Sequence, residues 1–72
     1  MQKEILFRKL IDENGKKIHR ICCWYFDEPE ERNDAYQEAL IRIWEQLHSF
    51  KGQSNISTWI YRVTVNSCLL VS

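Results

Sequence analysis

The sequence predicts an all-α fold, a compact bundle of three long helices plus a short one, in a single domain spanning residues 1–72. Apolar side chains recur at spacings of three and four residues through most of the chain, which is the period of amphipathic helices. No segment offers an evident partner strand for a sheet. With 44% hydrophobic and 28% charged residues, the composition is that of a folded globular domain and not of a disordered chain.

Two helices separated by a break are predicted before Phe26. The first carries two apolar pairs at i,i+4 spacing, which share a helix face: Leu6 with Leu10, and Phe7 with Ile11. Asn14-Gly15 then predicts a stop and restart, because both residues tolerate the left-handed conformation that ends helices. In the second helix one apolar stripe follows the i, i+3, i+4, i+7 pattern: Ile18, Ile21, Cys22 and Tyr25.

The third and longest helix is predicted over about residues 30–48. Asp27 is placed to cap its start, with Glu30 three residues on and Pro29 tolerated in the first turn. One apolar stripe is enough to bury this helix: Tyr36, Leu40, Ile43 and Leu47. The stripe beside it is therefore a candidate partner surface: Gln37, Ile41, Trp44 and His48.

A fourth helix is predicted to follow a polar loop over residues 50–55 and to run to about Leu70. Asn55 or Ser57 can cap it. Its expected core face comprises Ile56, Trp59, Ile60, Val63 and Cys68. The β-branched run at 63–65 makes a strand the alternative there, but the spacing of the apolar residues favours a helix.

The charges cancel overall, with 10 Lys+Arg against 10 Asp+Glu, but they are segregated along the chain. Residues 27–47 hold seven acidic and two basic side chains, whereas residues 48–72 hold two basic side chains and no acid. This segregation suggests two partners of different character, the alternative being one acidic and one mildly basic solvated face. The longest apolar run, residues 21–26, is far shorter than the ~20 residues of a membrane span, so no membrane association is expected.

Catalytic and metal-binding motifs are missing from the sequence. Three cysteines, two of them adjacent, indicate reduced thiols in the cytoplasm and not a disulfide framework. His19 and Cys22 form only one loose pair where a structural zinc site needs four converging ligands, and Cys22 lies in an apolar stripe. There is no nucleophile motif and no glycine-rich phosphate loop. We therefore expect no enzyme, no metal and no cofactor.

The stretch from Lys51 to Asn66 has the composition of a single-strand nucleic-acid contact. It combines polar side chains with the cations Lys51 and Arg62 and the aromatics Trp59 and Tyr61. Cations bind phosphates, aromatic rings stack on unpaired bases, and amides contact base edges. The alternative is a capped helix with a tryptophan in the core.

Two adjacent motifs carry a family resemblance. Residues 34–44 read DAYQEALIRIW, similar to the pattern D-x-x-Q-E-x-[FL]-x-x-x-W, and residues 50–66 read FKGQSNISTWIYRVTVN, similar to F-x-G-x-S-x-[FIL]-x-T-W-[LI]-Y-R-[IV]-x-x-N. These are the patterns of region 2 in bacterial sigma factors of the extracytoplasmic-function class, which the chain resembles over about residues 7–66. The resemblance implies the region 2 fold and a sigma factor's activity, which is to bind core RNA polymerase and to recognise and melt the promoter −10 element.

In that family the helix of the first motif docks on the clamp helices of the polymerase β′ subunit. Carried over by position, the implied polymerase-binding residues are Asp34, Gln37, Glu38, Ile41, Arg42 and Trp44. For Trp44 a place in the core is the alternative.

In that family the second motif opens the −10 element and holds a flipped base of the non-template strand. Carried over by position, the implied DNA-binding residues are Lys51, Gly52, Gln53, Ser54, Asn55, Ser57, Thr58, Arg62 and Asn66. Trp59 is expected in the core behind the loop, because it continues the face of Ile56 and Ile60.

The C-terminal end departs from the family pattern. Leu70 stands where the family has Asp, and the basic run that follows it is missing. Region 4, the domain that reads the −35 element, is absent from the 72 residues. These departures support an alternative, a truncated sigma-like module that binds RNA polymerase or an anti-sigma factor without opening DNA.

Overall fold

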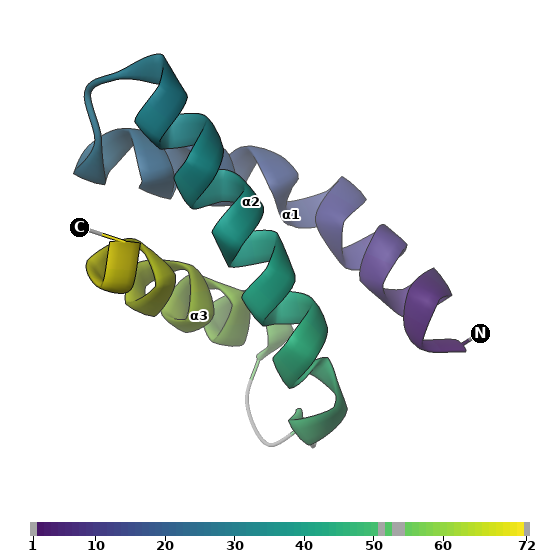
Figure 1. Ribbon diagram of the computed structural model, residues 1–72. Coiled ribbons are helices and arrows are strands. Elements are labelled where there is room, and N and C mark those ends of the chain that lie inside the picture. Colours follow the sequence, from purple (N-terminus) through teal and green to yellow (C-terminus); the bar gives the residue numbers. More distant parts are fainter. Residues whose placement is uncertain (1, 51, 53–54, 72) are drawn as a thin grey trace.

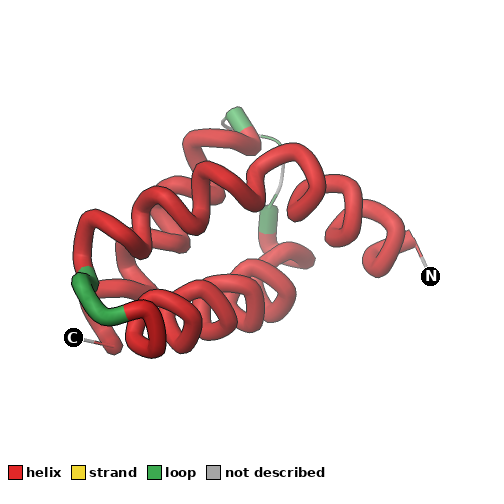
Figure 2. Tube along the Cα trace, turned by 90° about the horizontal axis from the view of Figure 1, so that it is seen from above, coloured by secondary structure: helices red, strands yellow, loops and turns green. Residues whose placement is uncertain are grey.

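Three α-helices and one short 3-10 helix make up the fold in the computed structural model, which describes residues 2–50, 52 and 55–71. The elements are α1 (Gln2–Tyr25), α2 (Pro29–Gln46), the 3-10 helix η1 (Leu47–Ser49) and α3 (Ile56–Val71). In Figure 1, α2 crosses in front of α1 and α3, which run in the same general direction. Figure 2 shows almost all of the described backbone as helix, joined by short non-helical segments. The all-α prediction is confirmed.

α1 is one continuous helix, so the predicted break at Asn14-Gly15 is wrong. Asn14 lies inside the helix, and its side-chain amide donates to the carbonyl oxygen of Leu10 at 3.0 Å. The hydroxyl of Tyr36 on α2 approaches Gly15 closely. A Cβ atom added at position 15 would lie 3.3 Å from that hydroxyl oxygen. Gly15 therefore lies inside the helix in close contact with α2, and it does not mark a turn.

The start of α2 also differs from the prediction. Glu28, and not Asp27, occupies the N-cap position, and its side chain makes no capping hydrogen bond. Pro29 takes the first helical position, where its missing N–H costs nothing. The connection from α1 is held instead by Arg32, whose Nε donates to the carbonyl oxygen of Phe26 at 2.7 Å.

The start of α3 agrees with the sequence. Asn55 caps the helix, because its Oδ1 accepts the backbone N–H of Ser57 at 2.8 Å. The helix continues through the β-branched run at 63–65, where the hydroxyl of Thr64 donates to the carbonyl oxygen of Ile60 at 2.8 Å. The helical prediction for this segment is confirmed and the strand alternative is wrong.

The core lies where the three helices meet. Its main part centres on one fully buried isoleucine from each helix, Ile18, Ile43 and Ile60. A smaller cluster towards the other end contains Cys22 and Cys68. The predicted core positions on α1 and α3 are largely correct, except that Leu6 and Tyr25 are exposed and that Thr64 and Ser67 are buried without having been predicted.

The buried residues of α2 differ in part from the apolar stripe predicted for this helix. Ile43, and Leu47 at the start of η1, are buried as expected, whereas Tyr36 and Leu40 are only partly buried at the edge of the core. The other fully buried positions of α2 are two alanines outside the predicted stripe, Ala35 and Ala39. Small side chains at these positions let α2 approach its neighbours closely. None of the described helices is long and apolar enough to cross a membrane.

Candidate partner surfaces on α2 and α3

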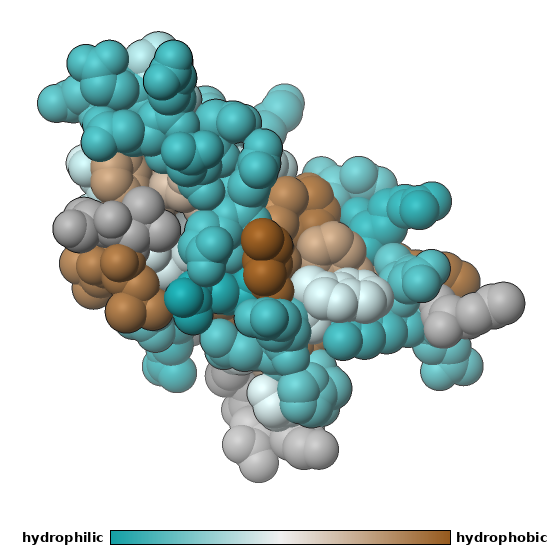
Figure 3. Space-filling view, viewed as in Figure 1, coloured by the Kyte–Doolittle hydropathy of each residue, from teal (hydrophilic) through white to brown (hydrophobic). Residues whose placement is uncertain are grey.

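The side of α2 that faces away from α1 and α3 carries most of the residues predicted to bind polymerase. Asp34 and Gln37 are exposed there, and Ile41 is 51% exposed. The space-filling view in Figure 3 shows apolar surface at the middle of this face, with hydrophilic residues on its left and further brown and pale surface on its right. Ile41 is therefore the most exposed large apolar side chain on this face of α2.

Glu38 and Arg42 lie at one edge of this face as an i,i+4 ion pair. Nε of Arg42 is 3.3 Å from Oε1 of Glu38, but it makes no hydrogen bond to any described residue although it is shielded from water. The N–H is therefore not aimed at the carboxylate. Partly exposed pairs of this kind contribute only about 0.3–0.5 kcal/mol, so these two side chains can rearrange at low cost against a partner.

Trp44 lies at the opposite edge and is half buried by α1. Its ring meets that of Phe7 edge to face, with 5.2 Å between centroids and 80° between planes. Nζ of Lys3 lies 4.1 Å from the centroid of the Trp44 ring. The remaining exposed part of Trp44 borders a shallow pocket together with Phe7 and Ile11. Trp44 thus contributes to the packing of α1 on α2 as well as to the surface beside Ile41.

The outer side of α3 presents three of the residues predicted to bind DNA. Thr58, Arg62 and Asn66 are exposed and four residues apart, which places them in one row along the helix. Asn55, also exposed, stands at the start of that row, where its side chain caps α3. Gly52 has a φ of 74°, which explains glycine at that point of the loop. The predicted contacts Lys51, Gln53 and Ser54 lie outside the described residues.

Ser57 does not join this row. Nζ of Lys17 on α1 donates to the Ser57 hydroxyl at 2.6 Å and to its carbonyl oxygen at 3.3 Å. The first turn of α3 is thereby tied to the middle of α1. This contact joins residues 40 positions apart, and nothing in the local sequence around Lys17 indicates it.

The two aromatic residues of the second motif occupy different environments. Trp59 is half buried against the core, and its ring lies 5.3 Å from that of Phe50 at the other end of the loop. Trp59 therefore packs at the edge of the core beside Phe50, and not fully inside the core as predicted. Tyr61, by contrast, is 42% exposed.

The cysteines form no metal site. The Sγ atoms of Cys22 and Cys68 are 3.9 Å apart in the core. The Sγ atom of Cys23 lies 3.7 Å from Nδ1 of His19. Burial is the main reason that the pKa of the Cys22 thiol rises from 9.0 to about 12, and it also raises the pKa of Cys68. Both core thiols are therefore protonated and unreactive at neutral pH. Among the described residues, no group of three or more His, Cys, Asp or Glu side chains could hold a metal ion.

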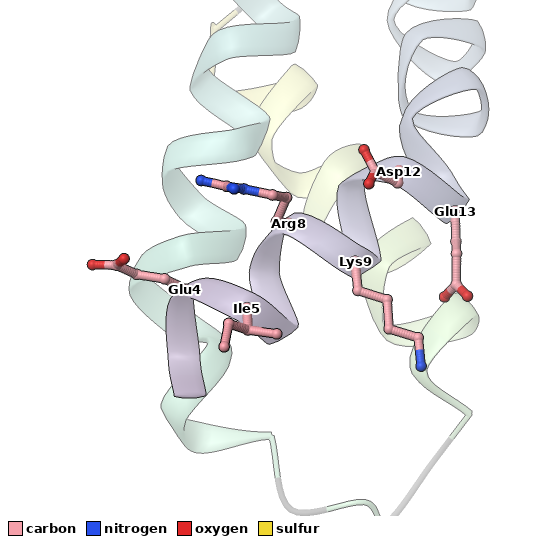
Figure 4. Close-up of a pocket in the computed structure, with 6 residues that line it drawn as sticks. All are labelled: Glu4, Ile5, Arg8, Lys9, Asp12 and Glu13. Carbon is pink, nitrogen blue, oxygen red and sulfur yellow. The ribbon is translucent and has the colours of Figure 1, made fainter. Parts of the chain in front are cut away.

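A shallow pocket on the outer side of α1 carries no recognisable chemistry. In Figure 4 its side chains come from successive turns of the helix and alternate in charge. Lys9 and Glu13 extend in one direction, and Glu4 and Arg8 in another. No elements converge on a common point here, so this surface is best described as the solvated face of α1.

Comparison with known proteins agrees with the resemblance noted in the sequence. The chain matches the Sigma-70 region 2 family over residues 10–69, and it therefore belongs to that family. The ECF RNA polymerase sigma factor SigW of Bacillus subtilis is 33% identical over 60 residues, which are 83% of this chain and 32% of SigW. The ECF RNA polymerase sigma-E factor of Escherichia coli K12 is 47% identical over 34 residues, 47% of this chain and 18% of that protein.

A third relative, the ECF RNA polymerase sigma factor SigG of Mycobacterium tuberculosis, is 42% identical over 36 residues, 50% of this chain and 10% of SigG. The chain thus spans about a tenth to a third of the length of these relatives. No solved structure is a significant match.

Proposed function

We propose that this chain acts as a sigma factor in the cytoplasm, binding core RNA polymerase and recognising and melting the promoter −10 element during transcription initiation. The observation that carries the proposal is the family match over residues 10–69, which includes both motifs. A role in binding and not in catalysis accords with it.

The exposed side of α2 is the proposed polymerase contact. Its residues are Asp34, Gln37, Glu38, Ile41, Arg42 and Trp44. Support comes from the exposure of Asp34, Gln37 and Ile41 on one side of α2. The clamp helices of the β′ subunit are the proposed partner, because they are the docking site implied by the family.

The loop and the outer side of α3 form the proposed contact with the non-template strand of the −10 element. Its residues are Lys51, Gly52, Gln53, Ser54, Asn55, Ser57, Thr58, Arg62 and Asn66. Support comes from the row of Thr58, Arg62 and Asn66, which offers a cation to phosphate and an amide to a base edge along one helix face. The role of Ser57 is indirect in this scheme, because its hydroxyl is bonded to Lys17.

Polymerase binding is tested by pull-down of core RNA polymerase with the purified chain. Ile41→Ala combined with Gln37→Ala should reduce capture at least several-fold, since both side chains lie on the proposed contact. Ile5→Ala is the matched control, because Ile5 is 71% exposed on α1, away from that face. Equal capture by all variants would refute the assignment of this surface.

DNA binding is tested by titrating a labelled single-stranded −10 oligonucleotide at two salt concentrations. Arg62→Ala and Asn66→Ala should weaken binding, with Arg8→Ala and Asn33→Ala as matched controls elsewhere on the surface. Wild-type affinity should fall as salt rises, because phosphate contacts release counterions. Polymerase capture without any oligonucleotide binding would favour the alternative, a protein-interaction module that binds polymerase or an anti-sigma factor and does not open DNA.

A further inference from the structure

Most of the residues that line a groove between α1 and α3 lie outside both family motifs. Its lining residues are Glu13, Lys16, Lys17, Arg20, Ile21, Trp24 and Tyr61. Six of the seven belong to α1, and only Tyr61 comes from the second motif. Ile21 is buried at 1% exposure and forms the apolar base of the groove.

The charge of this groove favours an anionic ligand. Lys16 and Arg20 are exposed, four residues apart on α1, and neither forms an ion pair within the described parts of the chain. Lys17 adds a third cation, held in place by its bond to Ser57. Glu13 is the single acid among the lining residues, so the groove carries an excess of positive charge in a chain of zero net charge.

The groove also exposes two aromatic rings. Trp24 is 66% exposed and Tyr61 is 42% exposed, although large aromatic side chains are usually buried. Nζ of Lys17 lies 6.0 Å from the centroid of the Tyr61 ring, so cation and ring form one surface. Exposed rings interleaved with cations are the composition of a surface on which unpaired bases stack while phosphates are neutralised.

The groove is continuous with the proposed DNA contact on α3. Tyr61 precedes Arg62 directly and stands three residues after Thr58, so its ring lies beside the row of polar side chains. On the other side Tyr61 borders Trp24 and Arg20 in the groove itself. A strand that leaves the row on α3 thus meets Tyr61 first and the cations of α1 next.

We propose that this groove binds the continuation of the single-stranded DNA whose other part lies on α3, with bases stacked on Tyr61 and Trp24 and phosphates held by Lys16 and Arg20. The proposal rests on the proposed function, since α3 must hold the first part of the strand. An acidic peptide would satisfy the cations, but it would leave the two flat exposed rings without a role. DNA is therefore the occupant that accounts for both features.

The experiment compares a short oligonucleotide of about 6 nucleotides with a longer one of about 12, both labelled, by fluorescence anisotropy, a range that fits known single-strand site sizes. Trp24→Ala should weaken binding of the longer strand roughly five-fold or more and leave the short strand unaffected, because loss of one stacked base has that effect. Trp24→Phe, which keeps an aromatic ring, should restore most of the affinity.

A salt series adds a second readout. Arg20→Ala should make the slope of log affinity against log salt for the longer strand shallower by about 0.7, the value for one phosphate contact on a single strand. Arg8→Ala is the matched control on the solvated side of α1 and should leave the slope unchanged. Helicity and thermal melting should stay at wild-type values, because Trp24 and Arg20 are exposed.

The possible failures are distinguishable. If Asn66→Ala weakens both oligonucleotides while Trp24→Ala and Arg20→Ala change neither, the groove assignment is wrong and the proposed function stands. If neither oligonucleotide binds the wild-type chain, both proposals for DNA fail. If polyglutamate binds in a manner that depends on Trp24 and the longer strand gains nothing over the short one, the groove belongs to an acidic protein partner and the proposal is overturned.

Discussion

Replacing Gly15 by alanine tests the continuity of α1, the point at which sequence and structure disagree. A glycine-to-alanine change inside a helix stabilises by about 0.8–1.0 kcal/mol. The hydroxyl of Tyr36 reduces this gain, because it lies 3.3 Å from the position of the new Cβ. That hydroxyl is the far end of a partly exposed side chain and can shift by a few tenths of an ångström, so the contact should cost about half of the gain. The expected net effect is a stabilisation of about 0.5 kcal/mol.

A double-mutant cycle separates the two contributions. In a Tyr36→Phe background the obstructing oxygen is gone, so Gly15→Ala should give its full ~1 kcal/mol. Thermal melts followed by circular dichroism should show an increase of about 2–4 °C for Gly15→Ala alone and about 4–8 °C when it is added to Tyr36→Phe. A destabilisation of more than about 1 kcal/mol in both backgrounds would refute the reasoning, because only a non-helical Gly15 would respond in that way.

Three further predictions follow from contacts within the core and at the start of α3. Asn55→Ala should lower stability by about 1 kcal/mol in a thermal melt through loss of the helix cap, whereas Asn55→Asp should retain stability yet weaken oligonucleotide binding by adding negative charge. Lys17→Met should cost about 1 kcal/mol in urea unfolding, because it removes the bond between α1 and α3. Under native conditions a thiol reagent should modify Cys23 quickly and the other two cysteines only after denaturant is added.

The raised pKa of Cys22 predicts that the free energy of unfolding depends on pH. Because the pKa of Cys22 is raised from 9.0 to about 12 in the folded chain, the unfolded chain loses this proton first as pH rises. The stabilisation from the protonated thiol is therefore complete below pH 9.0 and falls between pH 9.0 and about 12. Urea unfolding of the wild type against Cys22→Ala across this range measures the effect, and parallel curves would contradict it.

The predictions for Asn55→Ala and Lys17→Met each have an outcome that would contradict them. If Asn55→Ala left the melting temperature unchanged, the cap at the start of α3 would contribute nothing to stability. For Lys17→Met the comparison is Lys16→Met, which removes the same charge from an exposed position without a hydrogen bond and should stay within about 0.5 kcal/mol of wild type. Equal losses for both lysines would point to net charge and not to the bond with Ser57.

Helical periodicity was sufficient to predict the helices and most of the core. Apolar residues at i, i+3 and i+4 located the buried positions Ile18, Ile43 and Ile60, because amphipathic spacing is a local property of the sequence. The break assigned to Asn14-Gly15 was wrong because α1 stays helical there and packs on α2, where Gly15 meets the hydroxyl of Tyr36, 21 positions away in the sequence. Local turn chemistry cannot report such a contact.

The candidate surfaces were predicted less completely than the core. Motif position predicted contacts at Ile41, Arg62 and Asn66, which are exposed in the structure and remain predictions as contacts. It could not identify Lys17 as the residue that secures the start of α3, since that bond spans 40 positions. The exposure of Trp24 could not be predicted either, because within an apolar run it depends on how α1 packs against α3.

The separation of the two proposed surfaces has a genetic consequence. The outer side of α2 and the row on α3 lie on different helices and face different directions, with Ile43 and Ile60 buried between them. If the proposed contacts are correct, a variant damaged only on α3 would still occupy polymerase, and in a cell that also carries the intact gene it would behave as a dominant inhibitor. Under the same proposal, a variant damaged only on α2 would be recessive, because it would not bind the enzyme. Substitutions at Ile43 or Ile60 would be recessive too, since an unfolded chain competes for nothing.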